Sequence, residues 1–298
     1  MNTLALSRRS VAKQLIAGAA GLTALPTLAI AQSADDFAVR RKVNVAGRQR
    51  MLSQRMSRAI AFAALDIERE RHFQMLESAH AEFTRALAAL RIGDPGLDLP
   101  EENDPVVLGA LNSVESIWAV FGSLIRGIID KRAISEPELI AVAKNNTTLL
   151  FTADNVVKSL VSVYGDTGEN VGVAISINIA GRQRMLSQKM AKEAALIALG
   201  YETDRTVDHL GSTAELFEIS LKALLDGLPS ITLPPPPDVV RLKLLEVQDI
   251  WVGYRDIITS VADAGEATKF DLFAIAAQAD PLLVTMNDAV GLYETAGV

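Results

Sequence analysis

The sequence VNVAGRQRMLSQRM, residues 43–56, returns as INIAGRQRMLSQKM at residues 177–190. The two copies lie 134 positions apart and differ only by two Val/Ile exchanges and one Arg/Lys exchange. An internal repeat of this kind sets the organisation of a chain before any other feature is considered. We therefore expect two related halves, each built around one copy of the stretch.

Apolar residues around the first copy recur at spacings of three and four, which is the period of packed helices. These stripes predict an opening helix at about residues 36–65 and three further helices before residue 165. Gly93–Gly96 (GDPG) interrupts the pattern, Asp104–Pro105 predicts a helix start, and Ser135–Glu138 (SEPE) is a capping box. Four helices of this kind are typical of a four-helix bundle.

The second half repeats this pattern. Phe83 matches Phe217 at the offset of 134, whereas Trp118 matches Trp251 at 133, so one position is lost after the third helix begins. The fold class that we expect is all-α, with two tandem four-helix bundles related as a pseudo-dimer. The first bundle spans residues 32–166 and the second spans residues 169–298, with the boundary near Gly165–Gly168.

The N-terminus reads as a targeting signal. Ser7–Lys13 (SRRSVAK) resembles a twin-arginine export signal, an uncharged segment follows to residue 30, and Ala29–Ala31 fits a cleavage site. We therefore expect residues 1–31 to be a signal peptide and the mature protein to be soluble in the periplasm. A retained N-terminal membrane anchor is the alternative. No later segment is expected to span a bilayer.

Composition excludes several classes of function. There is no cysteine, so disulfides, thiol catalysis and thiolate metal sites are absent. Residues 32–298 hold 26 Lys and Arg against 36 Asp and Glu, a net charge of −10, which argues against nucleic acid as a partner. The three histidines, His72, His80 and His209, do not recur at equivalent positions, and no catalytic set or cofactor motif is recognisable. We expect no enzyme, no metal and no cofactor.

Helical geometry divides the repeated stretch into two faces. At about 100° per residue, Val45, Leu52 and Met56 face their own bundle, while Gly47 and Arg50 lie on the opposite side. A glycine within a helix costs about 1 kcal/mol relative to alanine, and it commonly permits close approach of another backbone. We therefore expect the two repeated stretches to pack face to face around a pseudo-twofold axis.

This packing would bring Arg50 and Arg184 together, with Arg48 and Arg182 beside them. Guanidinium groups remain charged, and neither stretch contains an acidic residue to neutralise them. Their parallel N–H donors match planar oxyanions, so a bound anion would satisfy the cluster. In the alternative interpretation, the arginines are surface residues that form salt bridges with acidic residues elsewhere in the bundle.

The stretch resembles a known family. Its pattern Asn-x-Ala-Gly-x-x-Arg-Met-x-Ser is similar to the P-box of periplasmic domains in nitrate/nitrite sensor kinases. The fuller INIAGRQRMLSQKM is more similar still to the PilJ-type domain, the N-terminal domain of type IV pili methyl-accepting chemotaxis transducers. The resemblance implies helical sensor domains in which two P-box helices hold one nitrate. The arginine before the methionine, here Arg50 and Arg184, would bind it.

This chain departs from the nitrate sensors in the two residues after the glycine, which are Arg-Gln here. Its 298 residues also contain no kinase or methyl-accepting region. We expect a periplasmic protein that binds a small oxyanion, nitrate or nitrite first, and signals to a membrane sensor or transporter component. The alternative is a structural or protein-interaction module. The expected ligand-binding residues are Arg50, Arg184, Gly47, Gly181, Arg48, Arg182, Gln54 and Gln188.

Overall fold

The computed structural model describes residues 25–165 and 170–295, with side chains from residue 36 in the first range and residue 171 in the second. The predicted boundary at residues 166–168 and most of the predicted signal peptide lie outside these ranges. Helix α2 begins at Leu25, eleven residues before the predicted start, and it ends at Ala64. The predicted cleavage site Ala29–Ala31 therefore falls within its first two turns.

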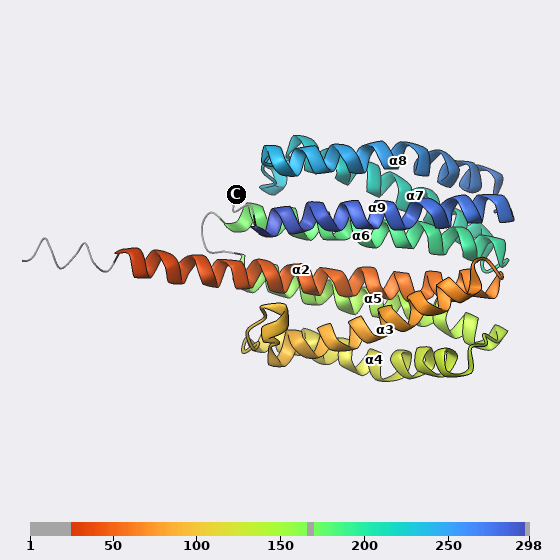
Figure 1. Cartoon of the computed structure of the whole chain (residues 1–298), viewed down its shortest axis with the longest axis horizontal. Coiled ribbons are helices and arrows are strands. Elements are labelled where there is room, and N and C mark those ends of the chain that lie inside the picture. Colours follow the sequence, from red (N-terminus) through yellow and green to blue (C-terminus); the bar gives the residue numbers. More distant parts are fainter. Residues whose placement is uncertain (1–24, 166–169, 296–298) are drawn as a thin grey trace, which may run out of the picture.

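Eight long helices account for nearly all of the described chain, and they lie side by side along one axis (Figure 1). Two short 3-10 helices, η1 (Pro95–Leu97) and η2 (Pro229–Ile231), interrupt equivalent loops. The all-α prediction is confirmed. The long helices are α2 (Leu25–Ala64), α3 (Arg69–Ile92), α4 (Pro105–Lys131), α5 (Glu136–Tyr164), α6 (Asn170–Ala198), α7 (Thr203–Asp226), α8 (Asp238–Ala264) and α9 (Lys269–Thr295).

The helices form two bundles, α2 to α5 and α6 to α9. Within each bundle the first helix packs against the second and the fourth, and the third packs against the fourth. The two bundles meet chiefly through α2 and α6, which lie at the centre of Figure 1. The two repeated stretches thus pack against each other, as the glycine argument predicted, and in this structure they do so within one chain.

Local sequence signals act where they were expected. Asp104 caps α4 by accepting hydrogen bonds from the backbone of Val106 at 2.8 Å and Val107 at 3.2 Å. The Ser135 backbone N–H donates to the Glu138 carboxylate at 2.9 Å in the predicted capping box. Gly93 ends α3 with φ 77°, where a Cβ would lie 2.9 Å from backbone atoms of the following loop.

Aromatic packing repeats between the bundles. Phe83 stacks on Trp118 with ring centroids 4.1 Å apart, and Phe217 lies 4.4 Å from Trp251 in the second bundle. The two tryptophans therefore pack against equivalent phenylalanines in the two bundles. The two cores are otherwise aliphatic, as 5% aromatic residues require.

Helix α4 corrects one expectation. It is the one helix, within the part of the chain that the structure describes, that is long and apolar enough to cross a membrane, with a mean hydropathy of 1.3. The expectation that no later segment has such a length was therefore wrong. A helix of a soluble bundle passes the same test when its apolar stripe faces the core, and α4 packs against α3 and α5.

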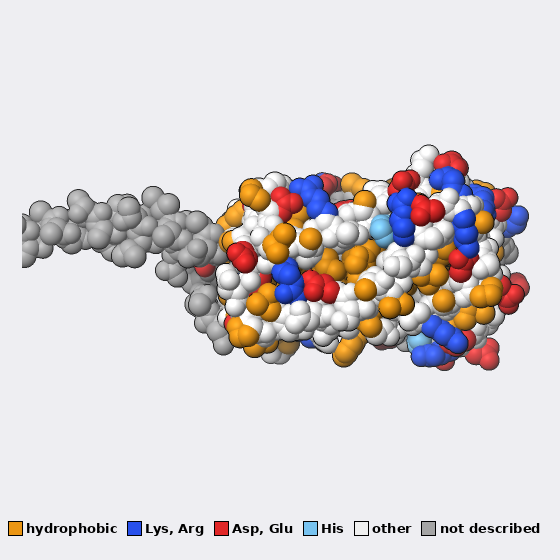
Figure 2. Space-filling model, turned by 90° about the horizontal axis from the view of Figure 1, so that it is seen from below, with side chains coloured by type: hydrophobic (Ala, Val, Ile, Leu, Met, Phe, Trp, Pro, Cys, Tyr) orange, Lys and Arg blue, Asp and Glu red, His pale blue; other side chains and the backbone are white. Residues whose placement is uncertain are grey.

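Charged side chains gather at one end of the molecule. Figure 2 shows the largest groups of Lys, Arg, Asp and Glu side chains at the end opposite the grey trace, with smaller groups of charged side chains among hydrophobic and uncharged ones along the rest of that face. Surface ion pairs join the helix ends there, among them Arg71 with Glu68 at 2.6 Å. Exposed pairs of this kind contribute about 0–1 kcal/mol each, so they add little to the stability of the bundles.

Candidate functional site

The central feature of the interface is a pair of buried arginines. Arg50 on α2 and Arg184 on α6 are each 1% exposed, although both carry a charge. A Cβ added to Gly47 would lie 3.3 Å from Arg50 Nη2 and 3.4 Å from Arg184 Nη2. A Cβ on Gly181 would lie 3.2 and 3.3 Å from Arg184 Nη2 and Arg50 Nη2. Both guanidinium groups therefore occupy the space that the two glycines leave open.

Arg50 is held by the opposite bundle and by its own fourth helix. Its Nη1 donates to Asn178 Oδ1 at 2.9 Å and its Nη2 donates to the Asn178 carbonyl at 3.0 Å. Nη1 also forms an ion pair with Asp154 on α5 at 2.8 Å. Burial lowers the pKa of Arg50, and the hydrogen bond that Arg50 donates to Asp154 partly offsets that effect.

Arg184 has the equivalent neighbours but no carboxylate. Its Nη2 donates to the Asn44 carbonyl at 3.2 Å, and its Nη1 donates to Asn287 Oδ1 on α9 at 2.9 Å. Asn287 occupies the position of Asp154 in the second bundle, so a neutral amide replaces a charged partner. Burial, followed by repulsion from Arg48 and Arg50, lowers the pKa of Arg184 to about 9. The guanidinium is still protonated at neutral pH, as arginines in proteins are.

Both arginines retain unused donors. The Nε atoms of Arg50 and Arg184 are buried and have no hydrogen-bond partner among the described residues. Asn44 Oδ1 also has no hydrogen-bond partner, whereas the Nδ2 of the same amide donates to Glu294. Buried polar atoms without partners are uncommon in folded proteins, and each calls for an explanation such as a bound water or ion.

The other predicted site residues lie outside this pair. Arg48 is half-buried and forms an ion pair with Glu82 at 3.0 Å. Arg182 is half-buried and has no hydrogen bond or ion pair within the described ranges, but its charge helps to lower the pKa of Arg50. Both therefore contribute positive potential near the pair and do not close over it.

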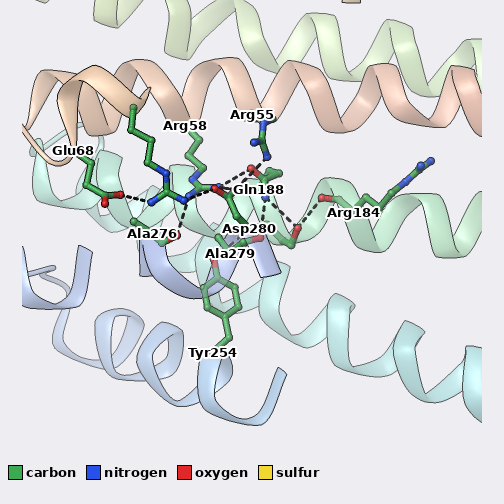
Figure 3. A network of polar contacts seen from close by, with 11 residues as sticks. Arg55, Arg58, Glu68, Arg184, Gln188, Tyr254, Ala276, Ala279 and Asp280 are labelled. Carbon is green, nitrogen blue, oxygen red and sulfur yellow. Dashed lines mark hydrogen bonds and ion pairs between the residues drawn. The ribbon is translucent and has the colours of Figure 1, made fainter. Parts of the chain in front are cut away.

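Gln54 and Gln188 belong to different clusters from the one predicted. Lys192 donates to Gln54 Oε1 at 2.8 Å, and Arg58 donates to Gln188 Oε1 at 2.8 Å. These side chains lie one helical turn beyond the arginines, and Figure 3 shows Arg184 directed away from Gln188 along α6. Their Nε2 donors are also used within the protein, by Gln54 to Ser53 Oγ at 3.1 Å and by Gln188 to the Ala279 carbonyl at 3.2 Å, so the structure does not place them as donors to the same anion.

Sequence reasoning missed the partners on the fourth helices. Asp154 and Asn287 lie more than 100 positions from the arginines that they contact, and neither belongs to the repeated stretch. Comparing the fourth helices at the offset of 133 would have exposed both the Asp/Asn exchange and its consequence for charge. The alternative interpretation, in which the arginines are surface residues paired with acidic residues, is wrong about exposure because both are buried; its salt bridge is present for Arg50 and absent for Arg184 among the described residues.

The histidines form no common site. His72 is buried against α2 and its Nδ1 lies 2.9 Å from the Ile67 carbonyl. Burial, with repulsion from Arg58, lowers the pKa of His72 to about 4. His80 Nε2 lies 3.2 Å from the Gly122 carbonyl. Over the residues that the structure describes, no group of three acidic or histidine side chains is arranged to hold a metal ion.

Comparison with known proteins places the chain in a family. The family described as "Type IV pili methyl-accepting chemotaxis transducer N-term" (PilJ) matches residues 38–144 and 168–270. The methyl-accepting chemotaxis protein McpN of Pseudomonas aeruginosa is 33% identical over 119 residues, which is 39% of this chain and 21% of McpN. The chain therefore spans about a fifth of the length of that relative.

Each family match includes one of the two buried arginines and ends before the residue on the fourth helix that contacts it. Each matched segment includes the repeated stretch with its glycine and arginine, while Asp154 and Asn287 lie beyond the matched residues. With one match in each half, the chain belongs to the PilJ family, the N-terminal sensory domain of methyl-accepting chemotaxis transducers.

Proposed function

We propose that this protein is a periplasmic sensory module that binds one small oxyanion, nitrate or nitrite first, between Arg50 and Arg184. The observation that carries the proposal is the buried guanidinium of Arg184, whose side-chain partner is a neutral amide where Arg50 has a carboxylate. A buried charge without a counter-ion is costly, so binding of an anion from outside would be favourable.

The charge balance sets the expected stoichiometry. Among the described residues, Asp154 is the carboxylate in contact with the two guanidinium groups, whereas Glu294 and Glu82 act on Arg184 through space, so we expect one monovalent anion. Planar oxyanions match the parallel donors of a guanidinium, and the unused Nε atoms of both arginines offer such donors. The glycines leave room for the guanidinium groups, so Gly47 and Gly181 support the site without contacting the ligand through a side chain.

Anion binding would also couple the two bundles. Arg50 and Arg184 repel each other across the interface between α2 and α6, and an anion between them would remove that repulsion. The free state is then the looser one, and a ligand that binds only the tight state shifts the population towards it. A membrane sensor or transporter component would read this change. Export would follow the twin-arginine route that residues 7–13 suggest.

The test is a series of thermal melts with nitrate, nitrite, chloride and sulfate at constant ionic strength. A specific ligand at a hundredfold excess over Kd adds about 2.7 kcal/mol to the free energy of unfolding. A rise in Tm that is selective for nitrate or nitrite supports the proposal. An equal response to every anion means screening only, and it rejects the site.

Two substitutions distinguish the effect of a carboxylate beside Arg184 on nitrate binding from the effect of the protein's net charge. Asn287→Asp gives Arg184 the carboxylate that Arg50 already has, so we expect it to weaken nitrate binding at least tenfold and to raise Tm without ligand. Asn112→Asp adds the same charge on the exposed face of α4 and should leave binding unchanged. If both variants bind nitrate equally, the ligand does not use Arg184.

The rival function is a protein-interaction module, and the ion pair between Arg50 and Asp154 favours it for the first arginine. Substituting both arginines, Arg50→Ala with Arg184→Ala, distinguishes the two functions. A folded variant without anion binding supports the sensory module. An unfolded variant shows that the arginines act in structure.

A further inference from the structure

A groove outside the arginine pair opens between α5, α6 and α7. It has a volume of about 320 Å³, and Lys192 of α6 forms part of its lining together with Thr147 of α5 and Arg205 of α7. Lys192 is only 9% exposed, while Thr147 and Arg205 are exposed at the rim. A buried cation therefore faces a cavity large enough to admit a small molecule.

Lys192 has only neutral partners. Its Nζ donates to Gln54 Oε1 at 2.8 Å and to Asn146 Oδ1 at 3.2 Å, and the described residues supply no carboxylate to it. The two acidic side chains of the groove are already engaged. Glu193 pairs with Lys189, and Glu202 pairs with Arg205 at 3.1 Å. Glu193, whose Oε2 has no hydrogen-bond partner, acts on Lys192 only through space, so Lys192 has no carboxylate in contact with it among the described residues.

The equivalent position in the other bundle shows how such a cation is satisfied. Arg58, the counterpart of Lys192, donates to Gln188 at 2.8 Å, as Lys192 does to Gln54, but it also forms an ion pair with Asp280 at 2.8 Å. Figure 3 shows Asp280 beside Arg58 and Gln188, and Arg55 also reaches its carboxylate at 3.1 Å. Arg71, the counterpart of Arg205, completes the cluster at 3.0 Å.

Thr147 replaces Asp280 at the related position on α5. The offset of 133 that aligns Asp154 with Asn287 also aligns Thr147 with Asp280. The groove keeps a cation, a glutamine and an arginine at the equivalent positions. It lacks the carboxylate, and open space lies there instead. The side chain that is missing is a methylene with a carboxylate, which has the size and charge of acetate.

We propose that this groove binds a small monocarboxylate, whose carboxylate group takes the place that Asp280 fills in the other bundle. Lys192 and Arg205 are the residues that contact it, and the exposed Lys144 at the rim adds attraction. Glu193, which stands where the first bundle has Ala59, disfavours a second negative charge in the groove. The site is independent of the anion site between Arg50 and Arg184.

The experiment is isothermal titration of the protein with sodium acetate and sodium lactate, with sodium chloride and sodium succinate as comparison ligands at equal ionic strength. We expect acetate or lactate to bind, chloride not to bind, and succinate to bind at least tenfold more weakly than the better monocarboxylate. If neither acetate nor lactate binds the protein, the proposal is overturned.

Two variants test the position. Thr147→Asp restores the internal carboxylate, so we expect loss of acetate binding together with a higher Tm in the absence of ligand. Thr147→Val removes only the hydroxyl and should keep binding within about threefold, a change of about 0.7 kcal/mol. If Thr147→Asp binds acetate as well as the wild type does, the ligand does not occupy the place of Asp280 and the inference fails.

The two anion sites can be told apart by crossing the variants. Asn287→Asp should weaken nitrate binding and leave acetate binding unchanged, whereas Thr147→Asp should do the reverse. Loss of acetate binding in Asn287→Asp, with none in Thr147→Asp, would move the carboxylate to the arginine pair and overturn the groove. A protein that binds acetate but not nitrate would reject the proposed function and leave this inference standing.

Discussion

The two bundles share the repeated stretch of their first helices almost residue for residue and differ in the charges of their fourth helices. In the first bundle α5 supplies Asp154 to Arg50 and leaves Thr147 beside Lys192. In the second bundle α9 does the opposite, with Asn287 beside Arg184 and Asp280 beside Arg58. In each pseudo-symmetric pair of cations, one cation therefore forms an ion pair with a carboxylate of the protein and the other does not.

This difference separates the scaffold from its specificity. The glycine, arginine and glutamine of the repeated stretch give the same geometry in both copies, so the stretch sets where the cations lie. The residues opposite them on the fourth helices determine whether a cation is satisfied by the protein or needs an anion from solution. The pair therefore offers an internal control for every substitution, because the same position can be changed in the other bundle.

The largest effect is expected for Asp280→Ala. Three arginines, among them the fully buried Arg58, lose their carboxylate, and removing one partner of a buried ion pair costs about 3–5 kcal/mol. Asp280 keeps 18% of its side chain exposed, so we expect the lower end, about 3 kcal/mol. Urea unfolding measures the loss. Thr147→Ala at the equivalent position is the control and should change stability by about 0.5 kcal/mol or less. Equal losses in both variants would remove the asymmetry that we infer.

A smaller effect is expected for Asp154→Asn, which makes the first arginine resemble the second. The hydrogen bond to Arg50 can persist, but the buried charge loses its carboxylate, so stability should fall by about 2 kcal/mol. Nitrate should then bind more tightly, because the cluster carries one more uncompensated charge. Chemical unfolding and nitrate titration measure the two changes on the same protein. A loss of nitrate affinity would show that Asp154 orients Arg50 for the ligand.

The sequence predicted the helices, their breaks and the meeting of the two repeated stretches, because these depend on local patterns. Gly93, Asp104 and Ser135 each mark a boundary through backbone chemistry that a few neighbouring residues determine. Gly47 predicted the meeting of the two stretches, although the space beside it is filled by the two guanidinium groups and not by the backbone of α6.

The partners of the cations were not predictable in the same way. These partners depend on which side chain of a distant helix packs opposite each cation. The spacing of apolar residues shows which face of a helix is buried, but it does not show which residue of another helix that face contacts. Gln54 and Gln188 illustrate the limit. They were expected to contact the same anion as Arg50 and Arg184. They lie one helical turn further along, where Gln54 contacts Lys192 and Gln188 contacts Arg58. The asymmetry between Thr147 and Asp280 was visible in the internal repeat, but its meaning depended on the position of Lys192.

The pH dependence of stability offers a third test of the comparison, at the groove. Burial lowers the pKa of Lys192 to about 8, below its ordinary value of 10.5. The unfolded chain then binds more protons than the folded one between pH 8 and 10.5, so this residue makes stability rise with pH across that window. The titratable groups that face it from its own helix and its neighbours are Lys189, Glu193, Lys144, Tyr201, Glu202, Arg205 and His209.

Lys192→Met should remove this rise and stabilise the protein at neutral pH by about 1–2 kcal/mol, since one pKa unit corresponds to about 1.4 kcal/mol and the groove keeps the charge partly solvated. Other groups titrate in the same range, so the measurement is the difference in unfolding free energy between the variant and the wild type from pH 7 to 10. Arg58→Met is the control. Because it removes the cation that Asp280 neutralises, it should destabilise the protein. A difference that does not change with pH would mean that Lys192 is solvated in the folded state.

The smallest effect on stability is expected for the two glycines, and here the bundles should behave alike. An alanine at Gly47 or Gly181 gains about 1 kcal/mol of helix propensity, but its Cβ would lie 3.2–3.4 Å from both Nη2 atoms. Either methyl group must displace the same two guanidinium groups, so both variants should lose most of that gain and weaken nitrate binding to a similar extent. Gly211→Ala, at a helical position with nothing within 4 Å, is the control and should stabilise the protein by about 1 kcal/mol. Thermal melts with and without nitrate give both quantities. Unequal losses of nitrate binding in the Gly47 and Gly181 variants would place the ligand closer to one bundle. That result would contradict a site shared equally by the two arginines.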